Sequence, residues 1–115
     1  IHDPAVAAAC AAARATLGRA FDVADLADAA GLSSSRLRAR FLAATGLSPR
    51  DWLAGLRIDQ ARRLLAETES TLATIATACG FADAYHLSHA FTRCTGESPS
   101  AFRAAVAAGR AWQAG

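Results

Sequence analysis

Apolar residues recur every three to four positions along most of this chain, in stretches separated by short polar segments that contain glycine or proline. This spacing predicts helices rather than strands, and the residues at the boundaries mark where they start and stop. Asp3 followed by Pro4 begins the first helix, which is expected to end near Gly18. Its inward stripe consists of Val6, Cys10, Ala13 and Leu17.

The next two predicted helices form a close pair, Val23 to Ala30 and Ser34 to Thr45, joined by a turn at Gly31. The second helix of this pair carries three arginines and no acid. The capping residues are Asp22 with Asp25 in capping-box position for the first helix, and Ser33 with the closing Gly46 for the second. Helical spacing directs Leu37, Phe41 and Ala44 inward, and Ser35, Arg38, Ala39 and Leu42 outward.

A longer helix is predicted from Pro49 to about Ala66. At 1.5 Å per residue its length is roughly 25 Å, which makes it the one element able to join two halves of the chain. With the width of the flanking elements added, this helix would hold a helix of the first half and its counterpart in the second half roughly 34 Å apart. That distance is about one turn of DNA.

After Glu67 to Ser70 the pattern of the first half begins again, with one extra residue in the second turn. The repeated unit is a short helix, a glycine turn, a helix with Leu-x3-Phe, a glycine stop and a Ser-Pro start. A shift of 49 places Asp22, Ala27, Ala30 and Gly31 on Thr71, Ala76, Cys79 and Gly80; a shift of 50 places Ser33, Leu37, Phe41, Gly46, Ser48, Pro49 and Trp52 on Asp83, Leu87, Phe91, Gly96, Ser98, Pro99 and Phe102.

The repeat predicts an all-α protein of seven helices, with two helix-turn-helix units joined by a long linker helix. The expected recognition helices are Ser34 to Thr45 and Ala84 to Thr95, and a last helix runs from Pro99 to Ala108. The predicted divisions are residues 1–50 and 67–108 for the two subdomains, 51–66 for the linker helix and 109–115 for a loose tail in which Trp112 stays unassigned.

Charge is uneven along the chain, although the net charge is only +2. Residues 1–30 contain two arginines and four aspartates, a net −2, whereas residues 31–50 contain four arginines and no acid, a net +4. All twelve basic residues are arginine, which suits bidentate contacts to phosphate or guanine and also fits a compositional bias. A helix with a basic outer face fits the major groove of DNA.

The remaining composition bears on compartment and completeness. Three cysteines without a CxxC pair argue against a disulfide framework and fit a reducing, cytoplasmic compartment. The short apolar runs are broken by charges, so no membrane span is expected. The chain begins at Ile1 without a methionine, which suggests a piece of a longer protein.

The ordered set of motifs closely resembles the DNA-binding domain of the AraC/XylS family of bacterial transcription regulators. The resemblance covers about residues 3–106. The motifs are GLS-x3-L-x2-RF, G-x-SP-x2-W, R-x3-A-x2-LL, IA-x2-CGF-x-D-x-Y-x-L-x3-F and G-x-SP-x2-FR. They fall on Gly31–Ser33, Leu37, Arg40 and Phe41; Gly46, Ser48, Pro49 and Trp52; Arg57, Ala61, Leu64 and Leu65; Ile75, Ala76, Cys79–Phe81, Asp83, Tyr85, Leu87 and Phe91; and Gly96, Ser98, Pro99, Phe102 and Arg103.

The resemblance implies that the outward positions of each recognition helix meet base edges, and helical spacing selects the same positions independently. Arg38 is the strongest candidate, because a guanidinium can pair with O6 and N7 of guanine. The expected base readers are Ser35, Arg38, Ala39, Tyr85, Ser88 and His89, and the expected phosphate contacts are Arg36, Arg40, Arg93 and Arg103.

Three residues depart from the family pattern. Ala39 is small where a polar or basic reader is frequent, Leu42 stands where a lysine is usual, and His89 where an arginine is frequent. We therefore expect the second recognition helix to bind less tightly than the first, with Arg38 dominant.

Blander interpretations exist for several of these residues. An arginine-bearing helix face is often only a solvated surface, and Arg57 and Arg103 often bond helix ends or carboxylates such as Asp59. Tyr85 and Phe81 could simply cover the core at the turn. Cys79, His86, His89 and Cys94 have zinc-like spacing, but Cys79 and Cys94 are expected to face inward and His89 outward, so no metal or other cofactor is predicted.

The sequence therefore predicts a DNA-binding domain of a bacterial transcription regulator, reading double-stranded DNA in two successive major-groove segments. RNA polymerase and a missing N-terminal effector-binding or dimerisation domain are the further partners that the resemblance implies. The sequence shows no paired carboxylates, no phosphate-binding loop and no activated nucleophile, so it does not predict an enzyme. The alternatives are a helical protein-interaction module, using Leu42, Leu47 and Trp112, and a DNA-targeting domain of a larger enzyme.

Overall fold

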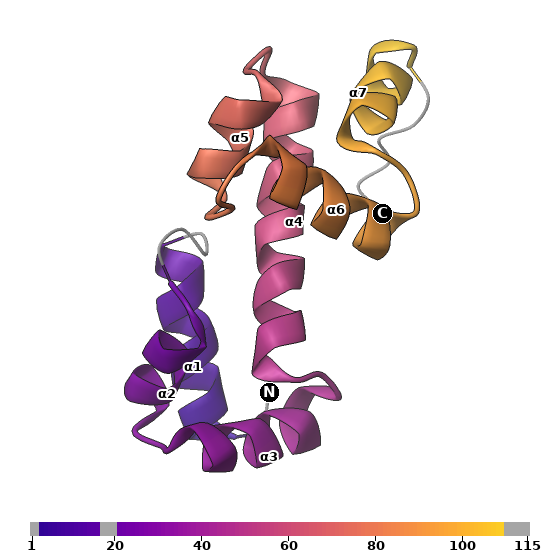
Figure 1. Ribbon diagram of the computed structural model, residues 1–115. Helices are drawn as coiled ribbons and strands as arrows, with labels where there is room; N and C mark the ends of the chain where they lie inside the picture. Colours follow the sequence, from indigo (N-terminus) through magenta and orange to yellow (C-terminus); the bar gives the residue numbers. More distant parts are fainter. Residues whose placement is uncertain (1–2, 17–20, 110–115) are drawn as a thin grey trace. The chain divides into compact units, whose positions relative to one another are not determined.

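The computed structural model (Figure 1) describes residues 3–16 and 21–109, which form seven α-helices and no strand. The helices are α1 (Pro4–Ala15), α2 (Val23–Ala30), α3 (Ser34–Thr45), α4 (Pro49–Glu67), α5 (Leu72–Ala78), α6 (Ala84–Thr95) and α7 (Pro99–Ala107). The predicted all-α class is confirmed. The first helix ends at Ala15 with Thr16 as its C-cap, three residues before the predicted end near Gly18. Leu17, which is expected on the inward stripe, and the tail with Trp112 lie outside the described residues.

The helix starts follow from short polar side chains that accept hydrogen bonds from otherwise unpaired backbone N–H groups. Asp3 Oδ1 accepts from the N–H groups of Ala5 and Val6 at 3.0 and 3.3 Å. Asp22 and Asp25 form the predicted reciprocal capping box at 2.9 and 3.0 Å. The caps of the later helices are Ser33, Thr71, Asp83 and Ser98.

Both recognition helices end in the same way. Gly46 and Gly96 have φ values of 79° and 84°, and the N–H of each donates to a carbonyl four residues earlier, that of Leu42 or Thr92. A side chain at this positive φ is strained, so glycine allows the chain to turn sharply into the following Ser-Pro helix start.

The described chain divides into two compact units, Ile1–Arg57 and Ile58–Gly115, each with its own hydrophobic core. The division falls within α4, whose two parts serve different cores. The first core consists of Val6, Ala9, Cys10, Ala13, Leu26, Ala27, Leu37, Phe41 and Leu53; the second of Ile58, Ala61, Leu65, Ile75, Ala76, Cys79, Leu87, Ala90 and Phe91.

An aromatic pair under each recognition helix shows that the repeat extends to packing. In the first unit the rings of Phe41 and Trp52 meet edge to face, with centroids 5.7 Å apart and planes at 65°. In the second unit Phe91 and Phe102 meet at 5.6 Å and 63°. The repeat-related residues therefore use the same geometry to hold α3 on α4 and α6 on α7.

Candidate nucleic-acid interface

The recognition helix α3 has a buried face and an exposed basic face. Leu37 and Phe41 are fully buried in the first core. Ser35, Arg38 and Ala39, the three predicted base readers of this helix, are exposed. Arg36 is exposed as well, so a continuous outer face of α3 presents two guanidinium groups.

The corresponding face of α6 is less charged and more aromatic. Leu87 and Phe91 are fully buried, while Tyr85 is 64% exposed, His89 is exposed and Ser88 is half-buried. The interpretation that Tyr85 covers the core at the turn is therefore wrong, because most of this side chain is exposed. Phe81 does pack against the second core.

The exposed rings of α6 form a cluster, which we call the ring cluster: Tyr85, His86 and His89. The Tyr85 and His89 ring centroids lie 4.6 Å apart with planes tilted by 49°, and Tyr85 meets His86 edge-on at 5.6 Å. A shallow open groove beside the cluster is lined by Tyr85, Ser88, His89, Thr92 and Arg93. Two predicted readers, Tyr85 and His89, thus contact each other.

His86 has a defined partner in Asp83, the N-cap of α6. Asp83 Oδ1 accepts from the His86 backbone N–H at 2.9 Å and lies 2.8 Å from its ring Nδ1. The backbone and ring hydrogen bonds from His86 lower the pKa of the Asp83 carboxyl below its ordinary value.

Arg40 turns away from the reading face to pair with Asp3, the N-cap of α1. Its Nε donates to Asp3 Oδ2 at 2.9 Å and its Nη2 to Oδ1 at 2.8 Å, a bidentate pair across the first unit. The Arg40 guanidinium lowers the pKa of Asp3, and burial partly opposes this effect. The predicted phosphate contact of Arg40 would therefore have to share a guanidinium that already holds α1 on α3.

The pair makes a testable contribution to stability. The pKa of Asp3 in the folded state lies below its ordinary value of 3.8. The ion pair therefore stabilises the fold when the pH is above 3.8, and this stabilisation is lost as the pH falls through the folded pKa. Asp3→Ser keeps a capping hydroxyl and removes the pair. We expect a slightly lower thermal midpoint for Asp3→Ser than for the wild type at pH 7, and equal midpoints once the pH lies below the folded pKa of Asp3.

Arg40→Gln serves as the matched control, because it removes the other partner and should give the same convergence at low pH. A difference between Asp3→Ser and the wild type that stays unchanged down to the lowest pH at which the domain is folded would show that the cap, and not the ion pair, carries the effect.

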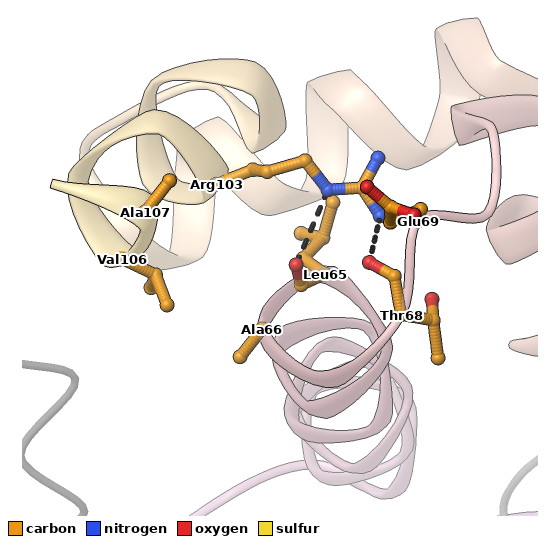
Figure 2. Close-up of a pocket in the computed structure, with 7 residues that line it drawn as sticks. All are labelled: Leu65, Ala66, Thr68, Glu69, Arg103, Val106 and Ala107. Atoms are coloured by element: carbon orange, nitrogen blue, oxygen red, sulfur yellow. Dashed lines mark hydrogen bonds between the residues drawn. The ribbon is translucent and has the colours of Figure 1, made fainter. Parts of the chain in front are cut away.

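Arg103 reaches from α7 to the end of α4, as Figure 2 shows. Its Nε donates to the carbonyl of Leu65 at 3.2 Å, its Nη2 to that of Thr68 at 3.1 Å and its Nη1 to that of Ser70 at 2.7 Å. All three nitrogens therefore bind backbone acceptors at the helix end and in the loop before α5. This arrangement agrees with the alternative that Arg103 bonds a helix end. The same side chain is a predicted phosphate contact, and its nitrogens already donate to backbone carbonyls.

The first unit holds its corresponding loop in a similar way. Arg57 Nη2 donates to the carbonyl of Phe21 at 2.5 Å, directly before the N-cap of α2. Phe21 corresponds by the 49-residue shift to Ser70, which directly precedes the N-cap of α5. Each unit thus uses an arginine to hold the segment that leads into its helix-turn-helix, which places the turn on the core.

A sequence profile of a helix-turn-helix domain family matches residues 26–105. A putative AraC-like transcription regulator of Streptomyces lividans is 43% identical over 103 residues, covering 90% of this chain and 34% of that protein. The chain belongs to the AraC family of transcription regulators. This domain is thus a helix-turn-helix DNA-binding domain of the AraC type.

Two further relatives support this assignment. The arabinose operon regulatory protein of Escherichia coli strain K12 is 43% identical over 84 residues, which are 73% of this chain and 29% of that protein. The crystal structure of the DNA-binding domain of AdpA in complex with a target DNA superimposes with a TM-score of 0.85 at 38% identity, covering 91% of this chain and 95% of that one. The chain spans about a third of the length of the curated relatives it matches.

The cysteine and histidine set of this AraC-type domain does not assemble into a metal site within residues 3–16 and 21–109. Cys79 is buried, and burial raises the pKa of its thiol to about 11, which disfavours the thiolate that a metal needs. Cys94 is exposed, so the expectation that it faces inward is wrong. It lies in the last turn of α6, where the inward stripe extends past the edge of the core. None of the described helices is long and apolar enough to cross a membrane.

Sequence reasoning missed two features of this interface. The spacing of His86 with the cysteines indicates only a zinc ligand, whereas the 50-residue shift places His86 on Arg36 and so on the outer face of the helix. The pairing of Arg40 with Asp3 had no sequence signal, because the two residues lie 37 positions apart on different helices.

Proposed function

We propose that this AraC-type domain binds duplex DNA by placing α3 and α6 in two successive major-groove segments. In the first segment Ser35, Arg38 and Ala39 face the base edges, and Arg38 pairs with a guanine. In the second segment Tyr85, Ser88 and His89 take the equivalent places. The methyl group of Ala39 suits contact with a thymine methyl.

Phosphate contacts position the two helices without reading sequence. Arg36 on α3 and Arg93 on α6 are exposed and fit this role. Arg40 and Arg103 are weaker members of the predicted phosphate set, since each donates two or three hydrogen bonds within its own unit. Their main role in this proposal is to hold the recognition helices in place.

One observation carries the proposal: two of the three predicted reading positions of each helix, Ser35 and Ala39 in α3 and Tyr85 and His89 in α6, are exposed in both units, on a fold that AdpA shares in a complex with its target DNA. Burial of Leu37 and Phe41 in α3, and of Leu87 and Phe91 in α6, leaves the predicted readers on the outside. A solvated surface with no partner would not require this exposure to recur at repeat-related positions.

Selection of bound sequences from a random duplex library tests the proposal. Two engaged helices should select a bipartite motif whose halves are centred about 10 base pairs apart. A Ser88→Ala, His89→Ala variant should lose preference in one half only. A single short motif, unchanged in that double variant, would contradict reading by α6, and the absence of any selected motif would contradict sequence-specific binding.

The remaining partners belong to the full-length protein. We propose that a segment outside this chain binds an effector or mediates dimerisation, since the matched relatives are more than twice as long as this chain. Leu47 is 46% exposed in the turn after α3 and offers an apolar contact for RNA polymerase. The family is one of transcription regulators, so we expect no catalytic activity from this domain and place it in the cytoplasm with the DNA.

A further inference from the structure

The two recognition helices differ in how much fixed positive charge they carry. Within its bounds α3 has three arginines and no acid, whereas α6 has one arginine, Arg93, and two histidines. The 50-residue shift places His86 on Arg36 and His89 on Ala39. If both imidazoles were protonated, α6 would reach the same +3 as α3.

The contact with Asp83 determines which ring nitrogen of His86 carries the proton in the neutral form. A carboxylate only accepts hydrogen bonds, so it favours the tautomer in which Nδ1 carries the proton and leaves Nε2 without one. In that neutral ring Nε2 is an acceptor and repels a phosphate oxygen. Protonation converts Nε2 into a donor, and the ring then forms a chain from Asp83 through His86 to a phosphate.

We propose that His86 is a phosphate contact of α6, and that protonation of His86 and His89 controls how tightly the second recognition helix binds DNA. This inference rests on the proposed function. The first helix, with guanidinium groups that stay charged, would bind over the whole accessible pH range. The second would tighten as the pH falls, because each protonated imidazole adds a positive charge to α6.

The charged and titratable neighbours of the ring cluster lie on α6 and on the elements that contact it. On α6 itself the neighbours are Tyr85, Arg93 and Asp83, and the lowered pKa of Asp83 keeps it ionised above pH 5. Of the elements packed against α6, α5 has no titratable side chain, and the buried Cys79 that follows it stays a neutral thiol. In α7 the titratable group is Arg103, which binds carbonyls at the end of α4, and Glu97 lies at the opposite end of α6 from His86.

The test measures the affinity of the domain for a fluorescent duplex, taken from the random-library selection, at pH 5.5, 6.5, 7.5 and 8.5 and constant ionic strength. The wild type should bind about fivefold more tightly at pH 5.5 than at pH 7.5, as expected for two added ion pairs. His86→Gln should lose a large part of this change, and His86→Gln, His89→Gln nearly all of it.

His86→Arg is the matched variant, because it restores the residue of the first unit. It should bind at pH 7.5 more tightly than the wild type does at that pH, by part of the fivefold change, because it restores one of the two charges, and its salt slope at pH 7.5 should be steeper by about 0.9. The same pH dependence in the double glutamine variant, or no pH dependence in the wild type, would overturn the inference.

Arg38→Ala separates this inference from the proposed function. It should weaken binding at every pH while keeping the fivefold change. Loss of affinity in Arg38→Ala without any pH dependence in the wild type would remove the role of the histidines and leave DNA binding by α3 intact. Unchanged affinity in Arg38→Ala would instead count against the proposed function itself.

Discussion

Replacement of Arg38 by alanine should weaken binding to a cognate duplex by about 1–3 kcal/mol and relax the preference at one base pair. Arg38 is exposed on the reading face of α3, opposite the buried Leu37 and Phe41. A guanidinium there can donate two parallel hydrogen bonds to a guanine, and alanine leaves the acceptors of that base without a partner. Fluorescence anisotropy with the cognate duplex and with single-base variants measures both effects.

Arg36→Ala is the control on the same helix. A phosphate contact should be lost equally on all sequences, and the slope of log affinity against log salt should become shallower by about 0.9. If Arg38→Ala behaves in this way and the base preference stays intact, Arg38 is a phosphate contact and the predicted division of roles on α3 is wrong.

The second large effect concerns stability rather than recognition. Arg103→Ala should lower the free energy of unfolding of the second unit by about 3 kcal/mol, since it removes three charge-assisted hydrogen bonds to backbone carbonyls. The figure is less than three separate bonds, because water can reach this half-buried site. Amide hydrogen exchange should show the loss in α5 and in the end of α4, while α2 keeps its protection.

Two variants sharpen this result. Arg103→Lys keeps the charge but cannot reach three carbonyls in a fixed fork, so it should recover less than half of the loss. Arg57→Ala should instead reduce protection in α2, whose leading segment it holds through Phe21. If Arg103→Ala leaves exchange unchanged and lowers DNA affinity, the phosphate contact is its main role.

The local structure was predictable because its determinants are local. Asp22 with Asp25, Ser33 and Asp83 cap helices through contacts within three residues, and the sequence spacing reveals them directly. The repeat then doubled the evidence for each element. The exposure of the proposed readers followed from helical periodicity alone, since the buried leucine and phenylalanine of each recognition helix define its inner face.

What periodicity does not reveal is the partner of a side chain or the extent of the core. Arg40 and Arg103 are of the residue type that contacts phosphate. The tertiary fold brings Arg40 to Asp3 and Arg103 to three backbone carbonyls, and neither pairing follows from the sequence pattern. Cys94 falls on the inward stripe by angle, yet the core ends before it. Which side chains meet DNA is a property of the complex, so the assignments of reader and phosphate contact remain predictions.

The aromatic pair beneath each recognition helix has a practical consequence for observing the two units separately. The first unit has a tryptophan at this place, Trp52, which lies under the guanidinium of Arg14 at 5.3 Å and against Phe41. The second unit has Phe102 in the same place. Among the described residues, the first copy thus contains an indole fluorophore and the second copy contains none. With Trp112 replaced by phenylalanine, the emission of Trp52 would report on one unit alone.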